Sequence, residues 1–306
     1  MKQNITIVGA NSYIARNLIS IIDKGKFDIF LYDRDDRHFD GCENYSQLDI
    51  LSMQAVEKIK WDCESLFWFS GATGTSVGFE QYKSFVEVNE LGLLNALSAY
   101  IKAQSKAKII FPSTRLVYKG SDEPLTESCE KEFKTPYALN KFSCENYLKM
   151  FQDMFGISYC VFRICLPYGE VDGIGSNAGA SFGTVGSFLR AAKSNKLITI
   201  YGDGSQKRTL THMNDLCDIM WKGAQSPMCH NDIYNIGGKD AFSLAEIAEK
   251  ISEVYGAEVK NVPWPEFDKK LESGSTVFDS SKLDKLLGYE YRCGFEEWIR
   301  NQDKIK

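Results

Sequence analysis

Strand-like and helix-like segments alternate along the first half of the chain, and this alternation limits the possible folds more than any other feature. The apolar, β-branched run at residues 5–8 is followed by a segment, residues 13–22, with the apolar spacing of an amphipathic helix. Further strand-like runs lie at residues 27–32, 66–69, 108–113 and 159–163. Parallel strands joined by helical crossovers form sheets covered on both faces. We therefore expect an α/β fold with a doubly wound parallel sheet.

The turn after the first strand has the sequence Gly9-Ala10-Asn11-Ser12-Tyr13-Ile14-Ala15. A dinucleotide-binding turn of the Gly-x-x-Gly-x-x-Gly kind needs a tight bend, hydrogen-bond donors for a pyrophosphate and a small residue for close packing. Gly9 can form the bend, Ser12 can offer its backbone N–H or hydroxyl, and Ala15 is small. We predict that a dinucleotide contacts this turn, at Gly9, Asn11, Ser12, Tyr13 and Ile14.

An acidic residue, Asp33, follows the second predicted strand. A carboxylate at this point of a dinucleotide-binding unit holds a ribose diol by paired hydrogen bonds and repels a 2′-phosphate. Asp33 therefore favours NAD as the cofactor. Arg34 and Arg37 can bind a phosphate, so NADP stays possible.

Tyr137 and Lys141 lie four residues apart on a predicted helix and so share one face. An ammonium near a phenol favours the ionised form of the phenol, which can then act as a general base. Thr114 follows the strand at residues 108–113, and ligands of open α/β sheets bind at the carboxyl ends of strands. These three residues are the candidates for catalysis.

The overall charge and composition exclude several classes of protein. A net charge of −5 without a basic tract argues against nucleic acid or an anionic membrane as the main partner. No apolar run approaches the length of a membrane span and no signal peptide precedes the first strand, so we expect a cytoplasmic protein. The nine cysteines lack a Cys-x-x-Cys spacing and the three histidines lack metal-ligand spacing, so we expect reduced thiols and no metal site.

Short islands along nearly the whole chain resemble the extended short-chain dehydrogenase/reductases of the NAD-dependent epimerase/dehydratase family. They occur in the family's order: the turn at Gly9, Asp49, Asn89, residues 113–118, the Tyr137/Lys141 pair, and residues 162–169, 200–208, 234–237, 281–283 and 287–289. His212 and Asp215 also match, and we expect the histidine to be a packing residue and the aspartate to cap a helix.

The resemblance implies a Rossmann-like NAD(P)-binding domain at residues 1–169. A smaller, interleaved substrate domain would comprise mainly residues 170–306, with about 213–240 returning to the first domain. Tyr137 would be the acid/base, Lys141 would hold the nicotinamide ribose, and Thr114 would bind the reacting sugar oxygen. Arg208 would bind the substrate diphosphate and Tyr201 the nucleotide base or its ribose. Further cofactor contacts are expected at Asp49, Ile50, Ser70 and Gly71.

The implied function is a nucleotide-sugar epimerase that acts through a transient 4-keto sugar and uses NAD. Two alternatives stay open: an NAD(P)H-dependent reductase of nucleotide-linked 4-keto sugars, and a non-catalytic NAD(P)-binding sensor or scaffold. Arg115 and Leu116 replace the acidic pair of dehydratases, which disfavours elimination of water.

Two further expectations concern substrate binding and assembly. The chain lacks a second diphosphate-binding arginine before Asp279, and Lys269, Lys270 and Arg292 are candidates to replace it. Surplus apolar residues at 80–104 and 136–155 predict a homodimer.

Overall fold

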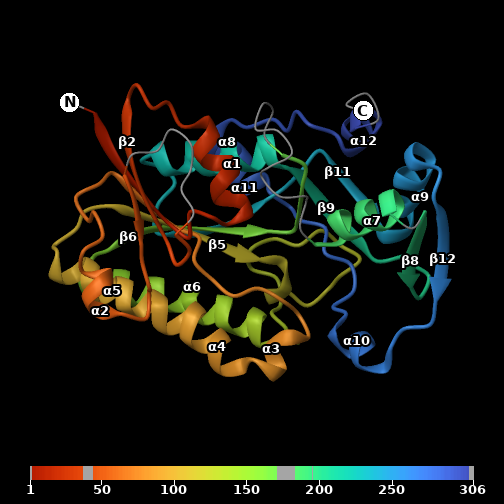
Figure 1. Ribbon diagram of the computed structural model, residues 1–306, viewed down its shortest axis with the longest axis horizontal. Coiled ribbons are helices and arrows are strands. Elements are labelled where there is room, and N and C mark those ends of the chain that lie inside the picture. Colours follow the sequence, from red (N-terminus) through yellow and green to blue (C-terminus); the bar gives the residue numbers. More distant parts are fainter. Residues whose placement is uncertain (1, 37–43, 171–182, 195, 303–306) are drawn as a thin grey trace.

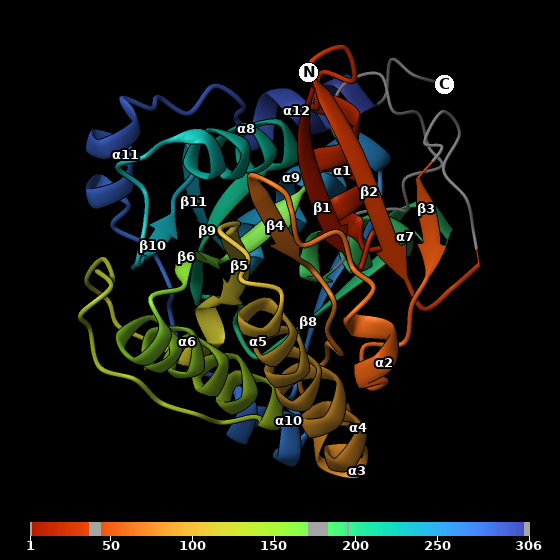
Figure 2. The ribbon, with the colours of Figure 1, turned by 90° about the vertical axis from the view of Figure 1, so that its left-hand side faces the viewer.

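The computed structural model describes residues 2–36, 44–170, 183–194 and 196–302. Its centre is a seven-stranded, wholly parallel sheet in the order β10-β6-β5-β4-β1-β2-β3 (Figures 1 and 2). The strands are β1 (Gln3–Val8), β2 (Phe27–Asp33), β3 (Tyr45–Gln47), β4 (Ser65–Trp68), β5 (Lys108–Thr114), β6 (Ser158–Ile164) and β10 (Asp232–Ile236). The predicted doubly wound parallel sheet is confirmed. Arg37, a candidate for binding a 2′-phosphate, lies outside the described residues.

Helices cover both faces of this sheet (Figure 2). On one face lie α1 (Tyr13–Ile21), α8 (Met213–Gln225) and α11 (Ser281–Leu287). The other face carries α2 (Met53–Val56), α3 (Val77–Glu80), α4 (Tyr82–Val86), the π-helix η1 (Glu87–Leu91), α5 (Gly92–Lys102) and α6 (Pro136–Phe155). Because both faces are buried, the strands are continuously apolar: Ile5, Ile7, Phe67 and Ile110 have no exposed surface.

A second lobe holds two small sheets at the far end of the molecule (Figure 1). One has the order β11-β9-β7 and the other pairs β12 with β8. Its elements are β7 (Leu166–Tyr168), α7 (Gly183–Ser194), β8 (Leu197–Tyr201), β9 (Lys207–His212), β11 (Asp240–Ser243), α9 (Leu244–Tyr255), β12 (Glu258–Val262), α10 (Glu266–Leu271) and α12 (Phe295–Asn301). Between β9 and β11 the chain returns to the large sheet to form α8 and β10.

The segment that follows α10 runs back between the two lobes. Thr276 pairs with Arg208 of β9, and Phe278 pairs with Leu125 of the loop before α6. The ring of Phe267 on α10 lies 5.6 Å from the ring of Phe79 on α3. Through these contacts the second lobe faces the carboxyl ends of the large sheet's central strands. Within the part of the chain that the structure describes, no helix combines the length and apolarity needed to span a membrane.

Candidate active site

The carboxyl ends of β1, β2 and β4 surround a cavity of about 410 Å³. Gly9, directly after β1, has a φ of +83°, and a Cβ atom there would lie 2.4 Å from the amide nitrogen of Ser70. Only glycine fits, because the conformation is left-handed and the next strand's backbone leaves no space. The cavity lining includes most of the predicted cofactor residues: Gly9, Ser12, Asp33, Asp49, Ile50, Ser70 and Gly71.

Five predicted cofactor residues do not line this cavity: Tyr137 and Lys141, described below, and three residues of the turn after β1, Asn11, Tyr13 and Ile14. Asn11 donates its backbone N–H to a carboxylate oxygen of Asp33 at 2.8 Å. Tyr13 is buried and its hydroxyl donates to the carbonyl of Gly169, while Ile14 packs against the core beneath α1. The reason is local: the hydroxyl of Ser12 caps α1 by accepting from the N–H of Ala15, so the following side chains already belong to the helix.

Acidic side chains predominate among the charged residues that line the cavity near the end of β2. Asp33, Asp35 and Asp49 line it, and Arg34 is the one cation among the lining residues. Asp33 has one oxygen bonded to Asn11 at 2.8 Å, and its other oxygen is 3.4 Å from the N–H of Asp35. This long contact leaves the second oxygen able to accept from a hydroxyl.

Tyr137 and Lys141 lie on α6, which begins with Thr135 as its cap and Pro136 in its first turn. The Nζ atom of Lys141 lies 6.0 Å from the centre of the Tyr137 ring and donates a 2.9 Å hydrogen bond to the carbonyl of Pro112 on β5. A Cβ atom on Gly71, in the cavity lining, would lie 3.8 Å from the same Nζ. Lys141 thus connects the tyrosine, the end of β5 and the cofactor cavity.

Burial controls the protonation of this pair. It raises the pKa of Tyr137 above its ordinary value and lowers the pKa of Lys141 to about 8. The sequence argument expects Lys141 to lower the phenol pKa; in the protein chain alone desolvation determines the direction of the shift. Tyr137 does lie in the first turn of α6, where the helix dipole favours a negative charge.

Thr114 ends β5 and caps the short 3₁₀-helix η2 (Arg115–Val117) by accepting from the N–H of Leu116 at 3.3 Å. It is 8% exposed. Because the hydroxyl accepts in this cap, its proton stays available to a ligand oxygen.

A buried ion pair beneath Thr114 was missed by the sequence reasoning. Arg163 of β6 binds Glu145 of α6 in a bidentate pair, with N–O distances of 2.9 and 2.5 Å. Ser113 donates to the same carboxylate at 2.5 Å. Two signals were available: an arginine within an apolar strand, and a glutamate four residues after Lys141 on the same helical face.

A second missed feature is the π-helix η1, which contains the buried residue Asn89. Its side-chain amide bonds both backbone groups of Ala72, at 2.8 and 3.1 Å. This clamp holds the loop after β4, including Gly71, against the cofactor cavity. π-Bulges within α-helices are frequent at functional sites.

Besides Thr114, the predicted substrate residues are Arg208 and Tyr201, which lie on different strands of the second lobe. Arg208 on β9 is 2% exposed, and its guanidinium binds the Glu272 carboxylate at 2.6 Å and the Gly274 carbonyl at 2.6 Å. Tyr201, at the end of β8, is 42% exposed and its ring lies 5.4 Å from that of Trp264. Arg208 lies near enough to Arg115, which directly follows β5, to affect its pKa.

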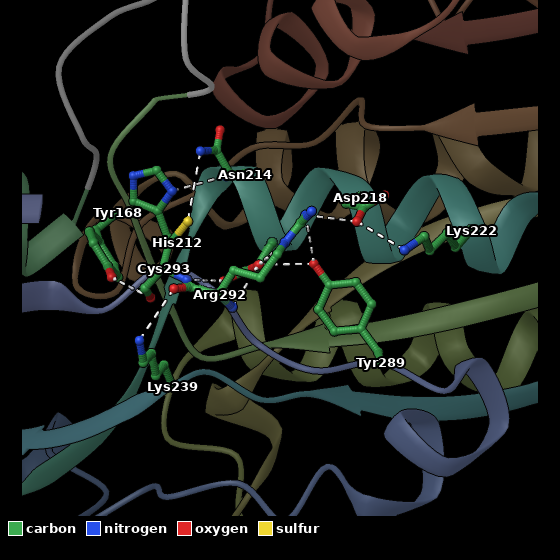
Figure 3. A network of polar contacts seen from close by, with 10 residues as sticks. Tyr168, His212, Asn214, Asp218, Lys222, Lys239, Tyr289, Arg292 and Cys293 are labelled. Atoms are coloured by element: carbon green, nitrogen blue, oxygen red, sulfur yellow. Dashed lines mark hydrogen bonds and ion pairs between the residues drawn. The ribbon is translucent and has the colours of Figure 1, made fainter. Parts of the chain in front are cut away.

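Arg292, a candidate for the second diphosphate-binding residue, belongs to a different network (Figure 3). It binds Asp218 at 2.8 Å and contacts Asp215 at 3.5 Å. The expectation that Asp215 caps a helix is wrong: His212 is the N-cap of α8, and Asp215 accepts from the Tyr289 hydroxyl instead. Lys269 and Lys270 are exposed on α10.

Across the described residues, no group of three His, Cys, Asp or Glu side chains is arranged to hold a metal ion.

Comparison with known proteins identifies the family. The model of the NAD dependent epimerase/dehydratase family matches residues 5–237. A UDP-glucuronate 4-epimerase of Thermodesulfobacterium geofontis is 26% identical, over 84% of this chain and 78% of that protein. A UDP-N-acetyl-alpha-D-glucosaminuronate decarboxylase of Bacillus cytotoxicus is 24% identical, over 98% of this chain and 96% of that protein.

Solved structures agree on the fold. The Thermus thermophilus UDP-glucose 4-epimerase in complex with NAD matches with a TM-score of 0.82 at 21% identity, covering 97% of this chain and 96% of that one. With the family model matching most of the chain, this protein belongs to the NAD-dependent epimerase/dehydratase family of enzymes.

Proposed function

We propose that this enzyme is a nucleotide-sugar epimerase that inverts the C4 carbon of a sugar through a transient 4-keto form. The observation that carries the proposal is the position of Lys141, which lies beside Tyr137 on α6, bonds the strand that ends in Thr114, and approaches the predicted cofactor cavity. Lys141 touches the end of β5 through the Pro112 carbonyl and approaches the cavity at Gly71. An acid/base, a cation and a hydroxyl at one edge of the sheet suit a reaction in which a hydroxyl loses and regains its proton.

The cavity suits NAD better than NADP. Gly9 permits close approach of a pyrophosphate to the backbone, and the N-terminus of α1 attracts negative charge. The Asp33 oxygen that makes only the long contact with Asp35 can bind a ribose diol. The cavity lining carries three carboxylates and one cation, Arg34, so its net negative charge disfavours an additional phosphate.

Each residue has a distinct task in the proposed reaction. NAD supplies the hydride acceptor, and as NADH the hydride donor, when it is bound. Tyr137 in its ionised form takes the proton of the C4 hydroxyl as the C4 hydride departs. It returns this proton after the keto sugar has rotated to present its other face to the hydride donor. Thr114 donates a hydrogen bond to that oxygen, and Lys141 holds the cofactor ribose and stabilises the phenolate. Arg208 binds the diphosphate, and Tyr201 offers an aromatic surface to the base.

One observation favours the alternative, a reductase of nucleotide-linked 4-keto sugars. Arg34 lines the cofactor cavity beside Asp33 and can bind the 2′-phosphate of NADPH. Such an enzyme uses the same catalytic residues once, in the reducing direction, and releases its oxidised cofactor after each turnover. An epimerase keeps its cofactor.

This difference supplies the test. The purified enzyme is added to UDP-, dTDP-, GDP- and CDP-sugars without external nicotinamide cofactor, and C4 inversion is followed by NMR. Inversion under these conditions is the expected result. Failure with every substrate, together with stoichiometric consumption of NAD(P)H on a 4-keto sugar nucleotide, would transfer the assignment to the reductase. Binding of NAD(H) without either reaction would favour a sensor.

A further inference from the structure

Arg115 is a cation that has no role in the proposed reaction. It follows Thr114 directly and is half-buried, and partial desolvation lowers its pKa to about 10. The guanidinium has five N–H donors, yet its one hydrogen bond within the described residues is a long contact of 3.4 Å to the Ser273 hydroxyl. No described carboxylate lies within 4.0 Å of it. A partly desolvated charge with so few partners is unfavourable, and an anionic ligand would compensate it.

The second contributor to the lowered pKa of Arg115 is Arg208, which shows that the two guanidinium groups are neighbours. Their contacts agree, because they bind three consecutive residues: Arg208 bonds Glu272 and Gly274, and Arg115 bonds Ser273. Like charges repel at this range. Two arginines are thus gathered around a single carboxylate, and one positive charge is left without a counter-ion.

The Glu272 carboxylate is bound as a ligand oxyanion would be. Its Oε1 atom accepts from Arg208 at 2.6 Å and from the backbone N–H of Gly274 at 2.9 Å. Gly274 has a φ of +83°, a left-handed conformation that glycine adopts without strain. Arginine forks and backbone N–H groups are common binding groups for phosphate and carboxylate.

We propose that Arg115 and Arg208 together bind one anionic group of the nucleotide sugar, at the position that Glu272 occupies in this structure. Arg115 is then the second cation that the sequence lacks before Asp279. Glu272 is a placeholder: it stabilises Arg208 until the ligand arrives and must move away when the ligand binds. This inference rests on the proposed function. The anionic group is either the diphosphate or a carboxylate carried by the sugar, since both offer the same oxygen geometry.

The test measures ligand affinity by calorimetry for the wild type and for Arg115→Gln, Arg115→Lys and Glu272→Gln. Arg300→Gln is the matched control, because Arg300 is exposed on α12. The first probes are UDP, dTDP, CDP and GDP, and the second are UDP-glucose and UDP-glucuronate. Melting curves establish that each variant is folded.

We expect Arg115→Gln to weaken binding about tenfold or more, Arg115→Lys to weaken it less, and Arg300→Gln to leave it unchanged. Glu272→Gln should tighten binding several-fold, because the competing charge is gone while a neutral amide keeps the hydrogen bonds. A merely structural ion pair would not give this tightening.

The probes separate the two sources of the anion. Weaker binding of the nucleoside diphosphates themselves by Arg115→Gln assigns the arginine to the diphosphate. Weaker binding of UDP-glucuronate alone assigns it to the sugar carboxylate. Unchanged affinity of Arg115→Gln for every probe would overturn the inference and leave the proposed function standing, and weaker binding by Glu272→Gln would overturn the placeholder. If the wild type binds none of the probes, both proposals fall.

Discussion

The ammonium of Lys141 on α6 and the carbonyl of Pro112 on β5 are joined by a 2.9 Å hydrogen bond. This contact ties the helix that carries Tyr137 to the strand that ends in Thr114. It fixes the lysine side chain beside the predicted cofactor cavity, where in the proposed mechanism one cation would serve both a phenol and a ribose.

The first prediction concerns Tyr137→Phe. Removing the hydroxyl should lower kcat by several orders of magnitude while the affinities for NAD and for the nucleotide sugar change little, because the oxygen moves the proton and the ring merely packs. Steady-state kinetics and calorimetry check this. Tyr147→Phe, on the same helix but bonded to Glu90, is the control and should keep its activity. More than a few per cent of the wild-type kcat in Tyr137→Phe would remove Tyr137 from the mechanism.

The second prediction is a pH dependence of stability that arises from Lys141. Its pKa falls from the ordinary 10.5 to about 8 on folding, so the unfolded chain binds more protons between these two values. Stability must therefore rise with pH across this window: the cost of the buried charge is fully present below about pH 8 and is relieved as the pH approaches 10.5.

Comparison with Lys141→Met isolates this effect. Between pH 7 and 9.5 the wild type should gain about 2 kcal/mol of unfolding free energy relative to Lys141→Met. Urea denaturation at the two pH values measures it, and a difference independent of pH would show that Lys141 is not desolvated. The same variant should be nearly inactive and should bind NAD more weakly, because the ammonium serves both tasks.

The third prediction addresses the ion pair beneath Thr114. Glu145→Gln leaves the Arg163 charge buried without a partner and should cost about 3–5 kcal/mol of unfolding free energy. Glu130→Gln breaks a solvent-exposed pair with Lys119 and should change stability little. Equal stabilities of the two variants in urea would contradict the buried placement of Glu145.

The fourth prediction is a homodimer formed through the helical face that carries α4 and α6. Large apolar side chains are exposed there: Val77, Phe79, Tyr82, Val86, Leu91, Leu139, Met150, Met154 and Phe155. These side chains lie on the neighbouring helices α3, α4, η1 and α6. Exposed apolar side chains gathered in this way favour an interaction surface, and a second copy would cover it symmetrically. Light scattering at micromolar concentration should give the dimer mass.

Charged variants locate the interface. Met154→Glu should shift the protein to monomer, and Met228→Glu, which places the same charge on an exposed methionine after α8, should not. A monomeric wild type would leave the apolar face without this explanation.

The sheet and its catalytic helix were predictable because their signals are local. Apolar periodicity marks each strand and helix, and Tyr137 and Lys141 share a face by spacing alone. The contacts between Arg115, Arg208 and Glu272 were not predictable, since these residues are far apart in the sequence and meet only through the path of the chain between lobes. The expected surplus of apolar residues was partly wrong. Leu93, Leu97 and Tyr100 are core residues because α5 packs against the sheet and its neighbouring helices, and Phe85 of α4 is buried as well.

Glu272 also bears on which anions reach the arginines. Because Glu272 is part of the chain, its carboxylate competes with free anions for the arginines at an effective concentration of roughly millimolar or more. An anion present at much lower concentration cannot displace it by a single contact. Inorganic phosphate, with a single point of attachment, would therefore have to compete with this tethered carboxylate for the arginines. A nucleotide sugar displaces the glutamate because its base, sugar and diphosphate bind at once. The glutamate thus makes the arginine pair respond to the size of the ligand as well as to its charge, and it keeps a strongly cationic recess from being blocked by small ions.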